Sequence, residues 1–189
     1  MAVDAFIYFV AKSADQQPNG ETQDDTFKKK KAFEIKEFSF DIENPATIGS
    51  ATTGAGSGKT KFNEFTIKKP TDSASLIFFK NACKGVHYPS VVLAVRKATG
   101  SVDDKQQPGP YLLFEFGTVF TTKIDWSGPG DEGPEEGITF AFSQLAIRYY
   151  PQDASGALKV AGKPMREIGW SVVTNAPMEK LSFLSLNPS

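Results

Sequence analysis

The sequence predicts a mainly β protein, a closed or partly closed antiparallel β-barrel with one flanking α-helix. Several segments alternate apolar and polar residues with the period of two that marks strands with one buried face. One segment, residues 72–84, has instead the spacing and the end signals of a helix. The 189 residues include 16 phenylalanines and are 40% hydrophobic, which is enough for the core of one domain spanning residues 1–189.

The apolar alternation changes parity twice, which is the pattern of strands that bend. Ile35 ends a run of apolar odd positions, and the run resumes at even positions with Phe38. A second change separates Phe142 from Leu145. One extra residue in a strand, a β-bulge, shifts the parity and bends the strand, as closing a barrel requires. A bulge is therefore predicted at each change, the first near Lys36–Glu37.

The clearest strand is predicted over residues 111–126. Six apolar side chains there occupy even positions, from Leu112 to Trp126, while odd positions carry charged residues such as Glu115. Strands rarely exceed about 10 residues. This one is therefore expected to coil around a barrel, with Gly117 at the bend. A further strand is predicted over residues 90–97.

The predicted helix, residues 72–84, has an unusually wide apolar face. Asp72 or Thr71 is expected to cap its start, and Gly85 to end it. The apolar face consists of Leu76, Phe79 and Cys83, widened by Phe78 and Ala82. This arc is broader than the usual stripe of about 100°. Two interpretations stay open: a neighbouring subunit covers the excess, through Ile77, Phe78 and Ala82, or the helix sinks deeper into the barrel mouth.

A glycine-rich stretch, residues 54–60, imitates a phosphate-binding loop. It ends in Gly58-Lys59-Thr60, but the motif needs a glycine at position 53, where the chain has Thr53. A phosphate-binding loop also leads into a helix, whereas residues 61–68 alternate like a strand. The stretch is therefore predicted to be a flexible surface loop, part of a long loop over residues 43–60.

The other residues that could catalyse a reaction or bind a metal lack the neighbouring groups that such a site requires. Cys83 and the only histidine, His87, lie on either side of the helix end at Gly85. Cys83 also belongs to the apolar face, where a buried thiol is inert. One cysteine and one histidine are too few for a zinc site, and the acidic pairs lack calcium-loop spacing. The chain is therefore predicted not to be an enzyme and to need no cofactor or metal.

The charge distribution excludes further classes. With 21 basic and 22 acidic side chains, the chain offers no basic surface for nucleic acid. No apolar run approaches the roughly 20 residues of a membrane span, so no membrane insertion is expected. The start of the chain lacks the features of a secretory signal, which predicts synthesis in the cytoplasm and, if the protein is exported, another exit route. The basic run Lys28–Lys31 is interpreted first as a solvated segment and second as a contact for an anionic partner.

Several segments, taken in order, resemble the Hcp (haemolysin-coregulated protein) family of type VI secretion systems. The segments that carry this resemblance are Gly58-Lys59, Phe65–Lys69, Asp72–Ser75, Ala82–Gly85, Val91–Arg96, Tyr111–Ser127, Glu136–Ser143, Tyr149–Gly156 and Gly169-Trp170-Ser171. None is diagnostic alone, but their order and spacing are specific, and together they span almost the whole chain. One departure is the lysine run in the first loop, where many members have a histidine-containing turn.

The resemblance implies a homohexameric ring that stacks into a tube inside contractile sheath proteins, capped by a VgrG spike protein. The tube is secreted, extracellularly and without a signal peptide, and effectors ride in its lumen. The loop 43–60 corresponds to the family's ring-stacking loop, which implies stacking residues at Thr47, Ser50, Thr53, Ser57 and Lys59. The residues themselves leave two alternatives open: a monomeric β-barrel ligand- or protein-binding module, and an enzyme that uses the glycine-rich loop or the Cys83–His87 pair.

Overall fold

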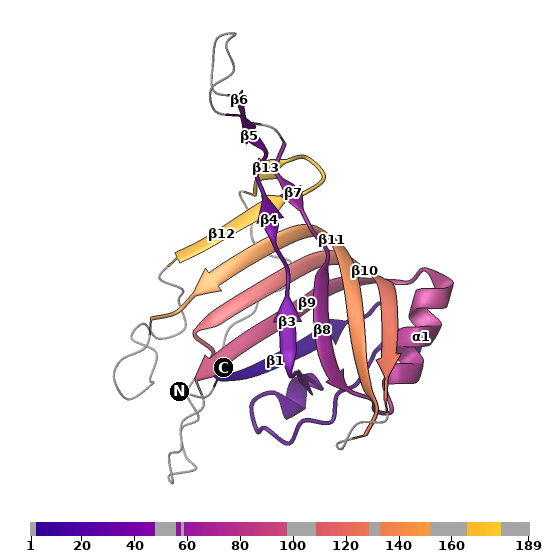
Figure 1. The fold of residues 1–189 in the computed structure, drawn as a ribbon. Helices are drawn as coiled ribbons and strands as arrows, with labels where there is room; N and C mark the ends of the chain where they lie inside the picture. The colour runs from indigo at the N-terminus through magenta and orange to yellow at the C-terminus, as the bar shows by residue number, and fades with distance from the viewer. Residues whose placement is uncertain are drawn as a thin grey trace.

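The computed structural model describes residues 3–47, 56–57, 59–97, 109–128, 133–151 and 166–178. Within these ranges strands dominate, accompanied by one α-helix and two short 3-10 helices (Figure 1). The strands are β1 (Val3–Val10), β2 (Phe33–Glu34), β3 (Glu37–Ser39), β4 (Ile42–Glu43), β5 (Ala46–Thr47), β6 (Gly56–Ser57), β7 (Lys61–Phe62), β8 (Phe65–Pro70), β9 (His87–Lys97), β10 (Leu112–Ser127), β11 (Glu135–Tyr149), β12 (Arg166–Ser171) and β13 (Ala176–Pro177). The helices are η1 (Ala14–Gln16), η2 (Lys28–Lys30) and α1 (Ser75–Lys84). The predicted fold class is confirmed.

The main sheet curls into a partly closed barrel. It has nine strands, in the order β13-β12-β11-β10-β9-β1-β2, and β8 pairs with both β11 and β3. The chain between β2 and β3 bridges the remaining gap. The Ile35 amide donates to the carbonyl of Ala5 in β1 (3.1 Å), and the next amide, of Lys36, donates to Lys68 in β8 (2.9 Å). Because no strand pair among the described residues closes the sheet, the barrel is partly closed.

The two parity changes arise where strands exchange partners, so the prediction of a bulge at each was wrong. Beyond Ile35 the chain leaves β1 and pairs, as β3, with β8. Along β11, residues 135–140 pair with β8, whereas residues 144–149 pair with β12. The register between β11 and β10 shifts elsewhere, between Thr121 and Lys123. Where a strand changes its partner, the face of the strand that is buried can change as well. The apolar residues then move from odd to even positions or from even to odd, because successive side chains point to opposite faces.

The long strand predicted over residues 111–126 is confirmed as β10, with two differences. Phe116 and Val119 are both fully buried in the main core although their parity differs. Thr118 between them adopts the left-handed conformation (φ 49°), so the bend lies one residue beyond Gly117. Glu115, expected on a polar face, is fully buried.

Aromatic rings fill the barrel. Phe65 stacks on Phe116 with 4.5 Å between ring centroids. Phe9 meets Phe78 and Tyr88 edge to face, each at 5.0 Å. Each such ring buries about 150–250 Å², and a well-oriented pair adds about 0.5–1.5 kcal/mol. The high phenylalanine content of the sequence therefore supplies the barrel core.

Helix α1 begins at Ser75, three residues later than predicted. Asp72 Oδ1 accepts a hydrogen bond from the Ala74 amide (2.9 Å), so the predicted capping residue ties down the turn that leads into the helix. Gly85 ends the helix in the left-handed conformation (φ 63°), as predicted. No helix in the described part of the chain is long and apolar enough to cross a membrane.

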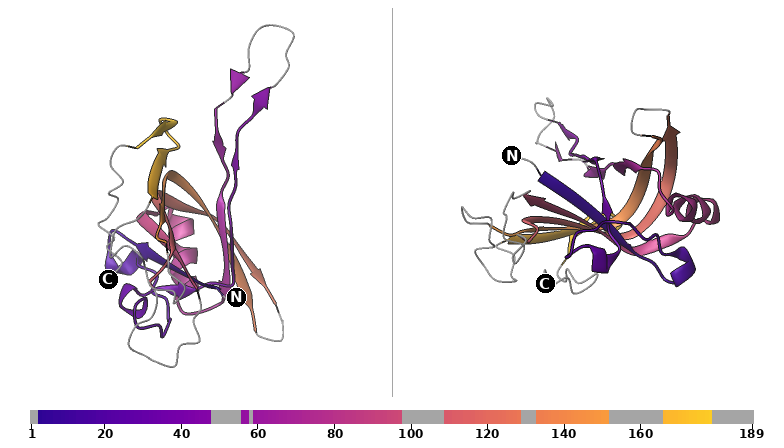
Figure 2. Two further views of the ribbon diagram at one scale, coloured as in Figure 1. Left: turned by 90° about the vertical axis from the view of Figure 1, so that its left-hand side faces the viewer. Right: turned by 90° about the horizontal axis from the view of Figure 1, so that it is seen from below.

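The predicted loop 43–60 was wrong where the structure describes it, because the chain forms a β-hairpin there. Strand β4 pairs with β7, and β5 pairs with β6. At the base, the Asn63 side-chain amide donates to Asp41 (2.5 Å) and Glu43 (2.8 Å). This extended hairpin, residues 42–47 with 56–57 and 59–62, projects away from the barrel (Figures 1 and 2). Strands β7 and β8 follow the glycine-rich stretch, so the helix of a phosphate-binding loop is absent there.

Candidate assembly surfaces

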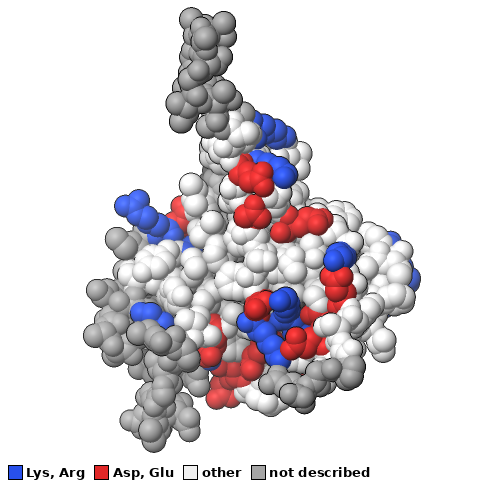
Figure 3. Space-filling view, in the orientation of Figure 1, with Lys and Arg blue, Asp and Glu red and all other residues white. Residues whose placement is uncertain are grey.

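Strands β3, β8, β11 and β10 present a polar face to solvent. Thr66 and Lys68 of β8 point to this face because Phe65 and Ile67, which alternate with them, are fully buried. Ion pairs cross the face: Lys68–Glu37 (2.6 Å), Lys36–Glu135 (2.5 Å) and Lys123–Asp125 (2.8 Å). Charges of both signs are interspersed over it (Figure 3). An exposed ion pair stabilises a fold by about 0–1 kcal/mol. The polar face is therefore a hydrated surface whose ion pairs contribute little to the stability of the fold.

These four strands leave two open edges among the described residues. Strand β3 pairs with β8 alone. On the opposite side, the part of β10 beyond Phe120 pairs with β11 alone, because the pairing with β9 stops at Phe120. Since each pair in the series β3-β8-β11-β10 is antiparallel, the two edges run in opposite directions. An open edge is a template for pairing with another chain.

Helix α1 lies beside the β10 edge and turns an apolar face to solvent. Leu76 is 75% exposed and Phe79 is 52% exposed. Trp126, near the end of β10, is 51% exposed, and its ring centroid lies 6.2 Å from that of Phe79. Cys83 is also exposed, one turn beyond Phe79 on the same face. These four side chains form the helix patch.

The helix patch reverses the assignment made from the sequence. The Cys83 thiol was predicted to be buried on the apolar face, and contact of Phe78 with a neighbouring subunit was one of the two interpretations left open. Phe78 is instead fully buried in the core, and the Cys83 thiol is on the surface, so both predictions were wrong. Ile77 and Ala82 are half-buried. Both faces of this helix are apolar, so spacing alone did not determine which one points inward.

An apolar groove lies on the other side of the barrel, between the extended hairpin and β12. Its volume is about 230 Å³, and its walls include Ile42 and Phe62 of the hairpin and Ile147, Ile168 and Trp170 of β11 and β12. Ile42 is 47% exposed and Ile168 is 63% exposed. The left view of Figure 2 looks onto this side, with α1 at the back. We call it the hairpin groove.

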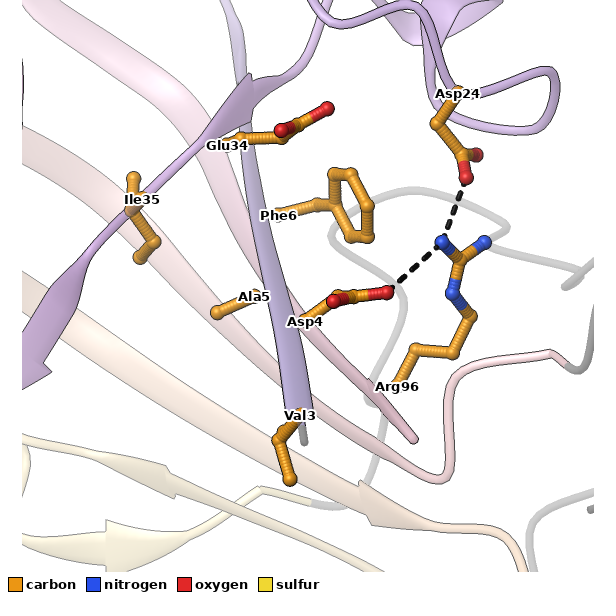
Figure 4. Close-up of a pocket in the computed structure, with 8 residues that line it drawn as sticks. All are labelled: Val3, Asp4, Ala5, Phe6, Asp24, Glu34, Ile35 and Arg96. Carbon is orange, nitrogen blue, oxygen red and sulfur yellow. Dashed lines mark hydrogen bonds and ion pairs between the residues drawn. The ribbon is translucent and has the colours of Figure 1, made fainter. Parts of the chain in front are cut away.

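A third hollow is built around a buried arginine at the start of β1 (Figure 4). Arg96 of β9 is 5% exposed and contacts Asp24 at 2.7 Å and Asp4 at 3.3 Å. Its guanidinium lies 4.9 Å from the ring centroid of Phe6. A desolvated cation over a ring contributes about 2 kcal/mol. These contacts hold the loop 12–31 on the barrel, so the buried Arg96 has a structural role.

A buried ionic network fixes the start of α1 and the end of β10. Lys69 and Glu136 are each 1% exposed, and the Lys69 Nζ lies 2.7 Å from Glu136 Oε1 and 2.9 Å from Asp72 Oδ1. Glu136 also accepts hydrogen bonds from Ser75 Oγ (2.8 Å) and Trp126 Nε1 (2.9 Å). The network therefore positions both elements that carry the helix patch.

Three of the five predicted stacking residues lie in the described part of the extended hairpin. Thr47 belongs to β5 and Ser57 to β6, which pair with each other. Lys59 is exposed just before β7. Ser50 and Thr53 lie outside the described residues. The hairpin therefore offers a projecting element for the predicted stacking contact, and the contact itself stays a prediction.

The basic run was predicted to be a solvated segment, and this holds for most of it. Lys28, Lys29 and Lys31 are exposed around η2. The Lys30 Nζ instead lies 5.3 Å from the ring centroid of Tyr8, and burial lowers the pKa of Lys30. One lysine of the run therefore packs on the barrel, and the other three keep their charges in solvent.

Comparison with known proteins places the chain in a family. The family model described as "Type VI secretion system effector, Hcp" matches residues 11–149. This chain is a member of the Hcp family. The resemblance found in the sequence is therefore confirmed, and with it the assignment to type VI secretion systems.

Two proteins of about equal identity support the Hcp assignment. Protein hcp1 of Pseudomonas aeruginosa is 28% identical over 118 residues, which are 62% of this chain and 68% of the relative. A solved structure described as a type six secretion system protein is also 28% identical, with a TM-score of 0.77 over 94% of this chain and 100% of that chain. Hcp1 from Salmonella typhimurium, at 22% identity and a TM-score of 0.67 over 94% and 100% of the two chains, shares the fold.

Proposed function

We propose that this Hcp protein forms a hexameric ring and that its rings stack into the inner tube of a type VI secretion system. One observation carries the proposal. The strand series β3-β8-β11-β10 ends in two open edges on opposite sides, with the helix patch beside one and the hairpin groove near the other. A ring requires a heterologous contact, in which two different surfaces of each copy meet. Family membership supports the same function.

The open edges supply a way to join the copies. The β3 edge of one copy and the β10 edge of the next run in opposite directions, so the antiparallel sheet continues across the contact. Each added copy leaves one edge open until the ring closes. The polar face would then line the lumen, where its balanced ion pairs present a hydrated wall to cargo.

The proposed partners follow from this role. They are other copies of the chain, a VgrG spike protein, contractile sheath proteins, and effectors carried in the lumen. The protein is proposed to be made in the cytoplasm and secreted by the type VI route without a signal peptide. The role is structural, and the absence of catalytic activity stays a prediction.

The mass of the purified protein in solution tests the ring. Light scattering after size-exclusion chromatography should give a species near six times 20.6 kDa. A monomer that persists at high protein concentration would contradict the ring. A monomeric binding module, the alternative that the sequence left open, would then become the working hypothesis.

Reversing the charge of Lys59 should weaken tube growth and leave the ring intact. Lys59 is the only charged residue between positions 44 and 60, so Lys59→Glu inverts the charge of the outer hairpin. A contact made by small polar residues tolerates such a charge poorly. We expect tubes to require about tenfold more protein, which corresponds to about 1.4 kcal/mol.

Electron microscopy and sedimentation of tubes measure this effect, and light scattering checks the ring. Lys61→Glu, at the hairpin base beside Glu43 (3.5 Å), is the matched control and should have the smaller effect. Equal tube growth of Lys59→Glu and wild type would remove Lys59 from the stacking contact.

A further inference from the structure

We infer that the helix patch of one copy docks in the hairpin groove of the next copy in the ring. The inference rests on the proposed ring and specifies the contact that closes it. Both surfaces are apolar and exposed, and they lie on opposite sides of the barrel (Figure 2). A head-to-tail ring needs such a pair of unlike surfaces on opposite sides of one chain.

The two surfaces match in shape and size. Leu76 and Phe79 stand out from the convex surface of a helix, with Trp126 beside them. The groove is concave and holds about 230 Å³, below the roughly 300–1,000 Å³ of small-molecule sites. That volume suits a few side chains of a partner surface. Exposed apolar patches rimmed by polar residues mark protein–protein contacts.

Charged residues of opposite sign border the two surfaces. The charged residues of α1 are Lys80, which lies 3.7 Å from Asp15 of the same copy, and Lys84, which is exposed. At the groove, Glu43 and Glu167 are paired with Lys61 (3.5 Å) and Arg148 (3.1 Å), whereas the exposed Asp41 accepts a hydrogen bond from the neutral Asn63 amide. Opposite charges around an apolar contact steer association and fix its register. Lys84 of one copy and Asp41 of the next are therefore the charges that would favour this contact.

The docking contact continues the proposed pairing of the open edges. Trp126 of the helix patch lies on the unpaired end of β10. Ile42 of the groove lies on β4, which follows directly after β3 along the chain. Pairing the β10 edge with the β3 edge of the next copy therefore brings the helix patch toward the groove. One continuous interface results, with strand hydrogen bonds at the sheet and apolar packing beside it.

Thiol crosslinking tests the contact because the only cysteine, Cys83, lies on the helix patch. An Ile168→Cys variant places a second thiol on the groove rim. A short bis-maleimide should then link Cys83 of each copy to position 168 of the next. Denaturing electrophoresis should show a ladder that reaches six copies, because each copy carries one thiol of each kind.

Three controls separate this contact from others. Wild type, with Cys83 alone, and Ile168→Cys combined with Cys83→Ser should give no ladder. Lys68→Cys, 54% exposed on the polar face, places a thiol away from the groove and should give none. Hexamers by light scattering without a ladder in Ile168→Cys, or with crosslinked dimers only, would overturn the docking contact and leave the ring standing. Monomers without a ladder would overturn the ring and the contact together.

A substitution on the helix patch provides an independent measurement. Phe79 is 52% exposed, so Phe79→Asp should leave the barrel folded, as circular dichroism can verify. Light scattering should show that hexamers are lost to folded monomers. Lys29→Glu, a charge reversal on the exposed lysine run around η2 and away from both surfaces, is the control and should stay hexameric. Hexamers of normal mass in Phe79→Asp would contradict docking through this residue.

Discussion

Replacing Glu136 with alanine should lower the free energy of unfolding by about 3–5 kcal/mol, the usual cost of removing one partner of a buried ion pair. Lys69, 1% exposed, would keep one carboxylate, that of Asp72 at 2.9 Å, beside the Pro70 carbonyl at 3.0 Å. Ser75 and Trp126 would lose the acceptor that each uses now, at 2.8 and 2.9 Å. The effect is large because three donors converge on one buried carboxylate.

Urea unfolding at one fixed protomer concentration measures this effect, since assembly couples to stability. Glu135→Ala is the matched control. Its side chain is 39% exposed and pairs with Lys36 on the surface, so it should change stability by less than about 1 kcal/mol. Replacing both buried partners, as Lys69→Met with Glu136→Leu, should recover much of the loss. Equal costs for Glu136→Ala and Glu135→Ala would show that the network contributes little.

The fold could be predicted from the sequence because a strand with one buried face leaves a local signal, the alternation of apolar and polar residues along the chain. Period-two alternation located β9 and β10, and the glycine at 85 located the end of α1. Partner exchange could not be predicted in the same way. Ile35 and Phe38 differ in parity because the chain crosses from β1 to β8, and no local pattern distinguishes this from a bulge.

The buried charges were missed for a related reason. Glu115 is fully buried against Arg148 (2.7 Å), 33 positions away in the sequence. Sequence patterns place a charged residue on the surface unless its partner is known. The helix patch was missed because both faces of α1 are apolar. Its exposure depends on Phe78 fitting among the aromatic rings of the core, which only tertiary packing reveals.

Alkaline pH should destabilise the fold steeply, because burial raises the pKa of Tyr8, Tyr88 and Tyr150 above the ordinary value of 10.0. The Glu115 carboxylate raises the pKa of Tyr8 further. The folded state therefore holds these protons more tightly than the unfolded state does. Their contribution is complete below about pH 10 and is lost as the pH rises from there to the folded-state pKa of each tyrosine, at no more than about 1.4 kcal/mol per pH unit for each.

Urea unfolding between about pH 9 and pH 11.5 would reveal this loss as a falling free energy of unfolding. Tyr8→Phe removes one buried phenol and should flatten the decline by about 1.4 kcal/mol per pH unit. Tyr149→Phe is the control, because that ring is 45% exposed, and it should keep the wild-type slope. If both variants keep the wild-type slope, the Tyr8 hydroxyl must reach solvent in the folded protein. The packing of η2 over Tyr8, where Lys30 lies 5.3 Å from the ring centroid, would then have to be looser than the structure shows.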